Sequence, residues 1–94
     1  MHKEILLHTT SNEDNQIGQR IRQVRLSRKL TQQAFSRSMG IVQGFLCGIE
    51  RGKKIPSDTL LIALSHLYEI NMEWLVSGTG PMAPVRETDN GQVH

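Results

Sequence analysis

Residues 32–51, QQAFSRSMGIVQGFLCGIER, decide the fold that this sequence predicts. Ser36 is a small residue at which one helix can cross another closely, and Gly40 can take the left-handed conformation that a tight turn needs. Leu46 and Ile49 lie three residues apart, so they face the same side of a following helix. The spacing therefore predicts two crossing helices, the second with a free outer face. An ordinary helical hairpin in a small bundle has the same spacing, and this alternative stays open.

Apolar periodicity outside this window predicts three more helices. Ile17, Ile21 and Val24 recur on one face of a first helix that runs to about residue 29. Ser57 is a suitable N-cap for a fourth helix, and Asn71 for a short fifth helix. The apolar face predicted for the fourth helix consists of Leu60, Leu61, Leu64 and Leu67. Together with the two helices of the window, this pattern predicts an all-α fold, a compact bundle of five short helices.

The chain is expected to form one small domain between two polar ends. The predicted helices cover residues 16–77. Residues 1–15 lack sustained periodicity and are expected to be a flexible N-terminal lead. Residues 78–94 are rich in glycine, proline and polar residues, which is typical of a flexible tail or linker. A domain of this size buries only about 60% of its unfolded surface, so we expect a thin, mostly aliphatic core.

The composition argues against several classes of protein. The single cysteine, Cys47, cannot form an internal disulfide, so a reducing, cytoplasmic compartment is expected. No apolar run approaches the roughly 20 residues that a membrane-spanning helix needs. The four histidines are scattered without metal-ligand spacing, and no nucleophile–base pair or phosphate-binding glycine loop is recognisable. The sequence therefore predicts neither an enzyme nor a metal or cofactor site.

The charge is divided unevenly along the chain. Nine basic residues and one acidic residue, Glu50, lie between residues 17 and 54, a net charge of +8. The rest of the chain has two basic and eight acidic residues, a net charge of −6. Such a division suggests a polyanionic partner for the basic half. A solvated basic face, common on helical domains, is the alternative.

The most specific similarity lies in short motifs spread over residues 17–77. They are Thr31-Gln32, Gly40, Gln43-Gly44, Glu50-Arg51-Gly52 and Pro56. Together they resemble the Cro/CI-type helix-turn-helix family of bacterial and phage regulators, also called the xenobiotic-response-element family. The segment from Asn71 to Met82 is similar to the domain ends of many prophage-type repressors. The resemblance implies a lambda-repressor-like domain that binds double-stranded DNA, with the helix-turn-helix at residues 32–51.

The resemblance also implies which residues contact DNA. In this family the first turn of the third helix reads bases, and the Gln43 amide matches the N6/N7 edge of adenine. An ion pair between Arg25 and Glu50 would hold the first helix to the end of the third. The predicted base-reading residues are Gln43, Gly44, Phe45, Cys47 and Gly48. The predicted phosphate-binding or positioning residues are Gln32, Arg25, Arg51, Lys53 and Lys54. Solvated surface roles remain the alternative for the charged residues.

Three features depart from the usual family pattern. Ser36 replaces a commoner alanine, so its hydroxyl needs a backbone partner. Val42 stands where serine or threonine usually caps the third helix, so this cap is expected to be weak. Gly44 and Gly48 leave the DNA-facing side with few side chains. Gln43 is therefore expected to carry much of the reading, together with Phe45 and the shape of the DNA.

The expected function is that of a sequence-specific DNA-binding transcriptional regulator, a repressor. It would act as a homodimer on a palindromic operator with half-sites about one helical turn apart. The candidate dimer residues lie in the fifth helix: Met72, Trp74, Leu75 and Val76. Closure of the monomer core by Trp74 is the alternative for this helix.

Two other hypotheses concern partners and further domains. In one, the chain is an antitoxin or protein-interaction module that docks a protein through residues 1–16 or 78–94 and uses the helix-turn-helix for autoregulation. In the other, the tail continues into a sensor or oligomerisation domain. Steep salt dependence of DNA binding would favour the regulator.

Overall fold

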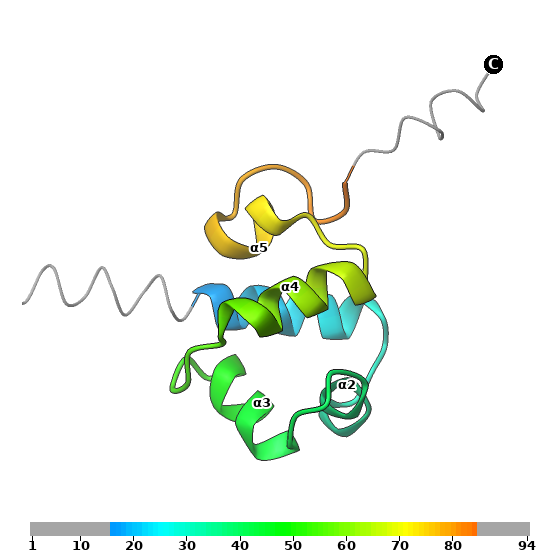
Figure 1. Ribbon diagram of the computed structural model, residues 1–94, viewed down its shortest axis with the longest axis vertical. Coiled ribbons are helices and arrows are strands. Elements are labelled where there is room, and N and C mark those ends of the chain that lie inside the picture. The colour runs from blue at the N-terminus through cyan, green and yellow to red at the C-terminus, as the bar shows by residue number, and fades with distance from the viewer. Residues whose placement is uncertain (1–15, 85–94) are drawn as a thin grey trace, which may run out of the picture.

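The computed structural model describes residues 16–84, which form five helices and no strand. The first helix covers residues 16–27, and the others are α2 (Gln32–Ser38), α3 (Gln43–Glu50), α4 (Asp58–Leu67) and α5 (Met72–Ser77) (Figure 1). The predicted all-α fold is therefore confirmed. The predicted lead, residues 1–15, and the end of the predicted tail, residues 85–94, lie outside the described residues. Within residues 16–84, no helix is long and apolar enough to cross a membrane.

Side-chain N-caps begin three helices at the residues that the sequence predicted. The Thr31 hydroxyl accepts a hydrogen bond from the backbone N–H of Ala34 at 3.1 Å, ahead of α2. Ser57 accepts from the third residue of α4 in the same way, and Asn71 from the second residue of α5. Each cap satisfies a backbone donor that the first turn of a helix leaves free.

The α3 helix begins without a side-chain cap, as predicted. Val42 precedes it with an extended backbone, and its side chain makes no capping hydrogen bond. We expect Val42→Ser to raise the free energy of unfolding by about 1 kcal/mol, because a hydroxyl there can accept from the N–H groups of the first turn. Urea denaturation measures this, with Val76→Ser as a control that replaces an exposed valine within a helix. A midpoint for Val42→Ser that is no higher than that of the unaltered protein would contradict the prediction.

Two glycines end α2 and α3 in the same way. Gly40 has a φ of 72° and Gly52 a φ of 79°, both left-handed. After α2, the N–H of Gly40 donates to Arg37 and the N–H of Ile41 to Ser36. After α3, the N–H groups of Gly52 and residue 53 donate to the carbonyls of residues 49 and 48. This pair of bonds satisfies the last free carbonyls of each helix, and glycine takes the left-handed position without a Cβ clash.

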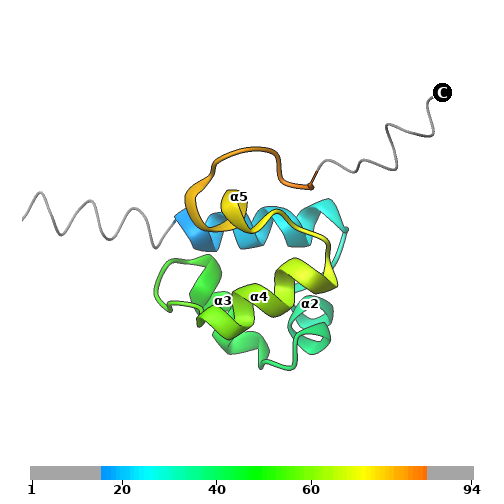
Figure 2. The ribbon, with the colours of Figure 1, turned by 45° about the horizontal axis from the view of Figure 1, so that its top comes forward.

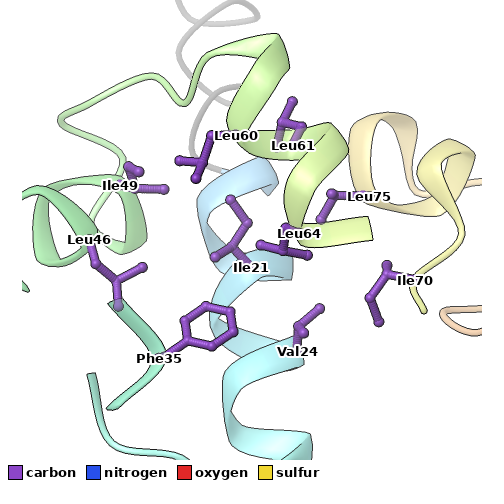
Figure 3. Close-up of a cluster of buried hydrophobic side chains, with 10 residues drawn as sticks. All are labelled: Ile21, Val24, Phe35, Leu46, Ile49, Leu60, Leu61, Leu64, Ile70 and Leu75. Atoms are coloured by element: carbon purple, nitrogen blue, oxygen red, sulfur yellow. The ribbon is translucent and has the colours of Figure 1, made fainter. Parts of the chain in front are cut away.

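The core is made of side chains from all five helices and the loop before α5 (Figure 3). It comprises Ile21, Val24, Phe35, Leu46, Ile49, Leu60, Leu61, Leu64, Ile70 and Leu75. The predicted inward stripes of the first helix and α3 are confirmed. The prediction for Leu67 is wrong, because this side chain is 53% exposed. α4 ends there, and the next residue, Tyr68, packs against the core instead, with its ring centroid 5.1 Å from that of Phe35.

One close approach between helices involves a residue that the sequence did not predict to be in a contact. Ser36 is buried as predicted, and its hydroxyl donates to the Gln33 carbonyl at 3.0 Å. Gly18 of the first helix, however, lies directly against the end of α3. A Cβ added at Gly18 would stand 2.0 Å from the carbonyl oxygen of Ile49. Only a residue without a side chain allows the two backbones to come this close.

The segment after α5 is part of the domain, so the boundary predicted at residue 78 is too early. Gly78 and Gly80 have left-handed backbones that turn the chain back. The N–H of Asn71 donates to the Met82 carbonyl at 2.7 Å, and its side-chain amide donates to the Pro81 carbonyl at 3.1 Å. The Met82 side chain packs against the core. The glycine- and proline-rich residues 78–82 therefore form a turn that packs on the domain, and not a flexible tail.

α5 lies beside the first helix (Figure 2), and an arginine links the two. Arg20 donates from Nε to the Leu75 carbonyl at 2.9 Å and from Nη2 to the Val76 carbonyl at 3.0 Å. These carbonyls belong to the last turn of α5, where a cation also interacts favourably with the helix dipole. Arg20 and its two acceptors are more than 50 residues apart in the sequence, and apolar periodicity did not predict this contact.

Candidate nucleic-acid interface

α3 has one buried face and one open face. Leu46 and Ile49 are fully buried, while Gln43 and Gly44 are exposed at the start of the helix. A Cβ added at Gly44 would meet no heavy atom within 4 Å. The outer surface of the first turn of α3 is therefore uncovered. A ligand can come close to the helix backbone there, because Gly44 has no side chain in the way.

A buried carboxylate holds the other end of α3. Glu50 is 8% exposed and Arg25 9% exposed, and Arg25 donates to it from Nε at 2.7 Å and from Nη2 at 3.1 Å. Arg25 Nη1 donates to the Leu30 carbonyl at 2.9 Å. The predicted ion pair is thus present, and it is bidentate, which is the strongest geometry for an arginine and a carboxylate. It joins the first helix and the loop before α2 to the last turn of α3.

Gln32, predicted to position or bind a phosphate, has a structural partner. Its side-chain amide donates to the Glu50 carboxylate at 3.0 Å. Arg22 is close to the same carboxylate at 4.0 Å, but its side chain is 58% exposed, so this pair adds little stability. The carboxylate therefore gathers groups from the first helix and α2 at the end of α3. Arg25 is fully engaged in this cluster, which makes it a positioning residue.

The five predicted base-reading residues are not equally accessible. Gln43 and Gly44 are exposed, whereas Phe45 is half-buried and packs against the core. Cys47 is also half-buried. Gly48 was predicted to be open, but it is covered: a Cβ added there would stand 2.5 Å from the side-chain Cγ of Lys54. Phe45 and Cys47 therefore point partly inward, and Gly48 lies under Lys54. The number of glycines on this face of the helix did not predict which positions are accessible.

Exposed cations surround the end of α3. Arg51 caps the helix, and Lys53 and Lys54 follow it, all three exposed. Gly52 reverses the chain between them, so they stay close to α3 instead of leading away. The exposed cations and the free first turn of α3 lie at the two ends of one helix.

The fifth helix is used mainly within the monomer, which corrects one prediction. Leu75 is fully buried in the core, so it is not part of a dimer face. Met72 and Trp74 are partly buried and pack against the core, as the alternative interpretation of Trp74 proposed. Val76 is 44% exposed and is the most accessible of these apolar candidates. In this six-residue helix, most of the apolar side chains pack into the core of the monomer, which leaves few for a dimer contact.

Arg28 and Tyr68 form a second link between elements, which no pattern in the sequence predicted. Arg28 Nη2 donates to the Tyr68 carbonyl, and its guanidinium carbon lies 5.6 Å from the centroid of the tyrosine ring. The Tyr68 hydroxyl is 2.5 Å from the Ser38 hydroxyl. These contacts join the end of the first helix, the end of α2 and the end of α4 on one side of the domain. Arg28 therefore has a structural role among the basic residues.

Comparison with known proteins agrees with this arrangement. Residues 18–81 match the family model of the helix-turn-helix domain. The uncharacterized HTH-type transcriptional regulator YobD of Bacillus subtilis (strain 168) is 31% identical over 72 residues, 77% of this chain. The aligned part is 64% of that relative, so this chain spans less than two thirds of its length.

A solved structure has the same fold. The crystal structure of the restriction-modification controller protein C.AhdI from Aeromonas hydrophila matches with a TM-score of 0.63 and 25% sequence identity. The match covers 69% of this chain and 94% of that chain. The family model, for its part, covers well over half of the sequence, including both helices of the window at residues 32–51. The chain therefore belongs to the helix-turn-helix domain family, as its resemblance to the Cro/CI-type regulators predicted.

Proposed function

We propose that this protein is a sequence-specific DNA-binding transcriptional regulator that places α3 in the major groove. The observation that carries the proposal is the exposure of Gln43 and Gly44 on a helix whose other end is held by the buried Glu50 cluster. A reading side chain discriminates between bases only when its backbone is held in place. The YobD relative is described as a transcriptional regulator, which supports the same function.

The proposed chemistry separates reading from positioning. The Gln43 amide donates to N7 or accepts from N6 of one adenine, and Gly44 allows the helix to approach the base edges closely. The exposed cations Arg51 and Lys53 attract phosphates, which supplies affinity without sequence information. The net charge of +8 over residues 17–54 is of the right sign for this partner.

We propose further that two copies bind a palindromic operator. One α3 offers only two exposed residues in its first turn, which can discriminate few base pairs. A second copy, with half-sites about one helical turn apart, doubles the sequence read and the number of phosphate contacts. Repression is favoured over activation by the similarity to prophage-type repressors. A reporter with the selected site overlapping its promoter tests the sign of regulation.

Selection of bound sequences from a random DNA pool tests the function, and Gln43→Ala tests the mechanism. We expect the unaltered protein to enrich a palindrome that contains an adenine contacted in each half-site. Gln43→Ala is expected to lose the preference for that adenine and to bind the selected site about tenfold more weakly. Binding titrations on the selected site and its single-base variants measure both effects.

The matched control is Gln23→Ala, which removes an exposed glutamine from the first helix. We expect this variant to keep both the affinity and the base preferences of the unaltered protein. If Gln43→Ala also keeps its base preferences, α3 does not read DNA through its first turn. If the pool yields no enriched sequence, the proposed function itself is wrong.

A further inference from the structure

Gly48 lies beneath the side chain of Lys54. If a Cβ were built at Gly48, it would stand 2.5 Å from Cγ of Lys54, 3.4 Å from its Cβ and 3.7 Å from its Cδ. The first part of the lysine side chain therefore occupies the space that a side chain at position 48 would fill. Lys54 as a whole remains exposed, so its stem covers the helix while its charged end is available.

The backbone fixes Lys54 in this place. The N–H groups of Lys53 and Lys54 both donate to the Gly48 carbonyl, at 2.8 and 3.1 Å. Gly52, with its left-handed φ of 79°, turns the chain so that both donors reach this one acceptor. The Lys54 backbone is thus tied to α3 by a hydrogen bond as well as by side-chain contact. Lys53 shares the acceptor, yet its side chain is not among the closest neighbours of Gly48.

Gly44 and Gly48 are one helical turn apart, so they lie on the same face of α3. At Gly44 this face is open, and at Gly48 it is covered by the stem of Lys54. A face with two glycines has no side chain of its own at these positions, and only Lys54 supplies one. Lys54 belongs to the loop after α3, but its side chain lies where a side chain at position 48 of α3 would lie.

We propose that Lys54 is a base-reading residue that crosses Gly48 and donates from Nζ to the O6 and N7 acceptors of a guanine in the major groove. The inference rests on the proposed function, and it differs from the phosphate contact that the sequence suggested for Lys54. Guanine is the base whose major-groove edge presents two acceptors to a lysine or arginine. Gly48 acts as a positioning residue, because its missing side chain makes room for the lysine stem.

The test uses the full chain, the palindrome selected by the unaltered protein, and a set of single-base variants of that palindrome. Lys54→Met keeps most of the stem and removes the ammonium group. Gly48→Ala keeps the ammonium group and displaces the stem. We expect both variants to lose the preference for the same guanine, about tenfold each. The double variant is expected to lose no more than either single variant, because both changes remove one interaction.

Lys53→Met is the matched control. If Lys53 contacts a phosphate, its loss weakens binding to all sequences alike and reduces the slope of log K against log salt by about 0.9, with every base preference kept. Lys54→Met is expected to differ from it by losing one base preference. Thermal melting checks that Gly48→Ala folds, and Lys54→Met carries the test if it does not.

Two results would overturn the inference while leaving the proposed function in place. In the first, Lys54→Met behaves as Lys53→Met does, with a uniform loss and an unchanged preference, which makes Lys54 a phosphate contact. In the second, a folded Gly48→Ala keeps the guanine preference. If the unaltered protein selects no sequence at all, the proposed function fails first, and the inference fails with it.

Discussion

Glu50→Leu is expected to lower the free energy of unfolding by about 3–5 kcal/mol, because it leaves the Arg25 guanidinium buried without its carboxylate. Both residues of the pair are less than a tenth exposed, and Glu50 also accepts from Gln32. A domain of this size has a total stability of roughly 5 kcal/mol, so the variant should keep less than half of that stability. Urea denaturation followed by circular dichroism measures the loss.

A double-mutant cycle separates the ion pair from the change in packing. We expect Arg25→Met to be destabilising as well, since it leaves the buried carboxylate without its main partner. The double variant Arg25→Met with Glu50→Leu is expected to be more stable than either single variant, because no buried charge is left unpaired. Glu73→Ala, which removes an exposed carboxylate from α5, should change the stability by less than about 1 kcal/mol. Single losses that simply add in the double variant would show that the two side chains do not stabilise each other.

Gly18→Ala is expected to destabilise the domain by about 3 kcal/mol, although alanine is the better helix former. The added Cβ would stand 2.0 Å from the Ile49 carbonyl oxygen and 3.0 Å from its carbonyl carbon, and it would lie 3.5 Å from Cα of Glu50. These are backbone atoms, so they cannot rotate away as a side chain can. The first helix and α3 would have to separate, which would also disturb the Glu50 cluster. Thermal and urea denaturation measure the loss.

Gly44→Ala is the matched control for this prediction. Gly44 is also a helical glycine, but an added Cβ meets no heavy atom within 4 Å. We expect this variant to gain about 1 kcal/mol in the free energy of unfolding from helix propensity alone. A Gly18→Ala variant that gains stability as Gly44→Ala does would show that the first helix and α3 are farther apart than in this structure.

The predictions from sequence were most reliable for features that depend on residues only a few positions apart, such as helix caps and tight turns. Thr31, Ser57 and Asn71 cap their helices as predicted, because a capping oxygen needs only the N–H groups two or three residues later. Gly40 adopts the predicted left-handed turn for the same local reason. These signals are independent of how the helices pack.

Sequence reasoning failed where accessibility depends on distant contacts. Leu75 fits an apolar face in the sequence, but in the folded domain it is fully buried in the core. Gly48 has no side chain of its own, yet Lys54 covers it. Periodicity shows which residues share a face of a helix, and it does not show what lies against that face.

The sequence by itself determined the five helices, most of their ends, the inward stripes and the motifs of the helix-turn-helix family. It did so because caps, turns and periodicity act over a few residues. Only the tertiary structure decided the contact of Gly18 with Ile49, the return of residues 78–82 onto the domain and the burial of Leu75. These depend on the distances between separate helices and loops. The accessible residues of α3 were decided in the same way, and with them the surface proposed to read DNA.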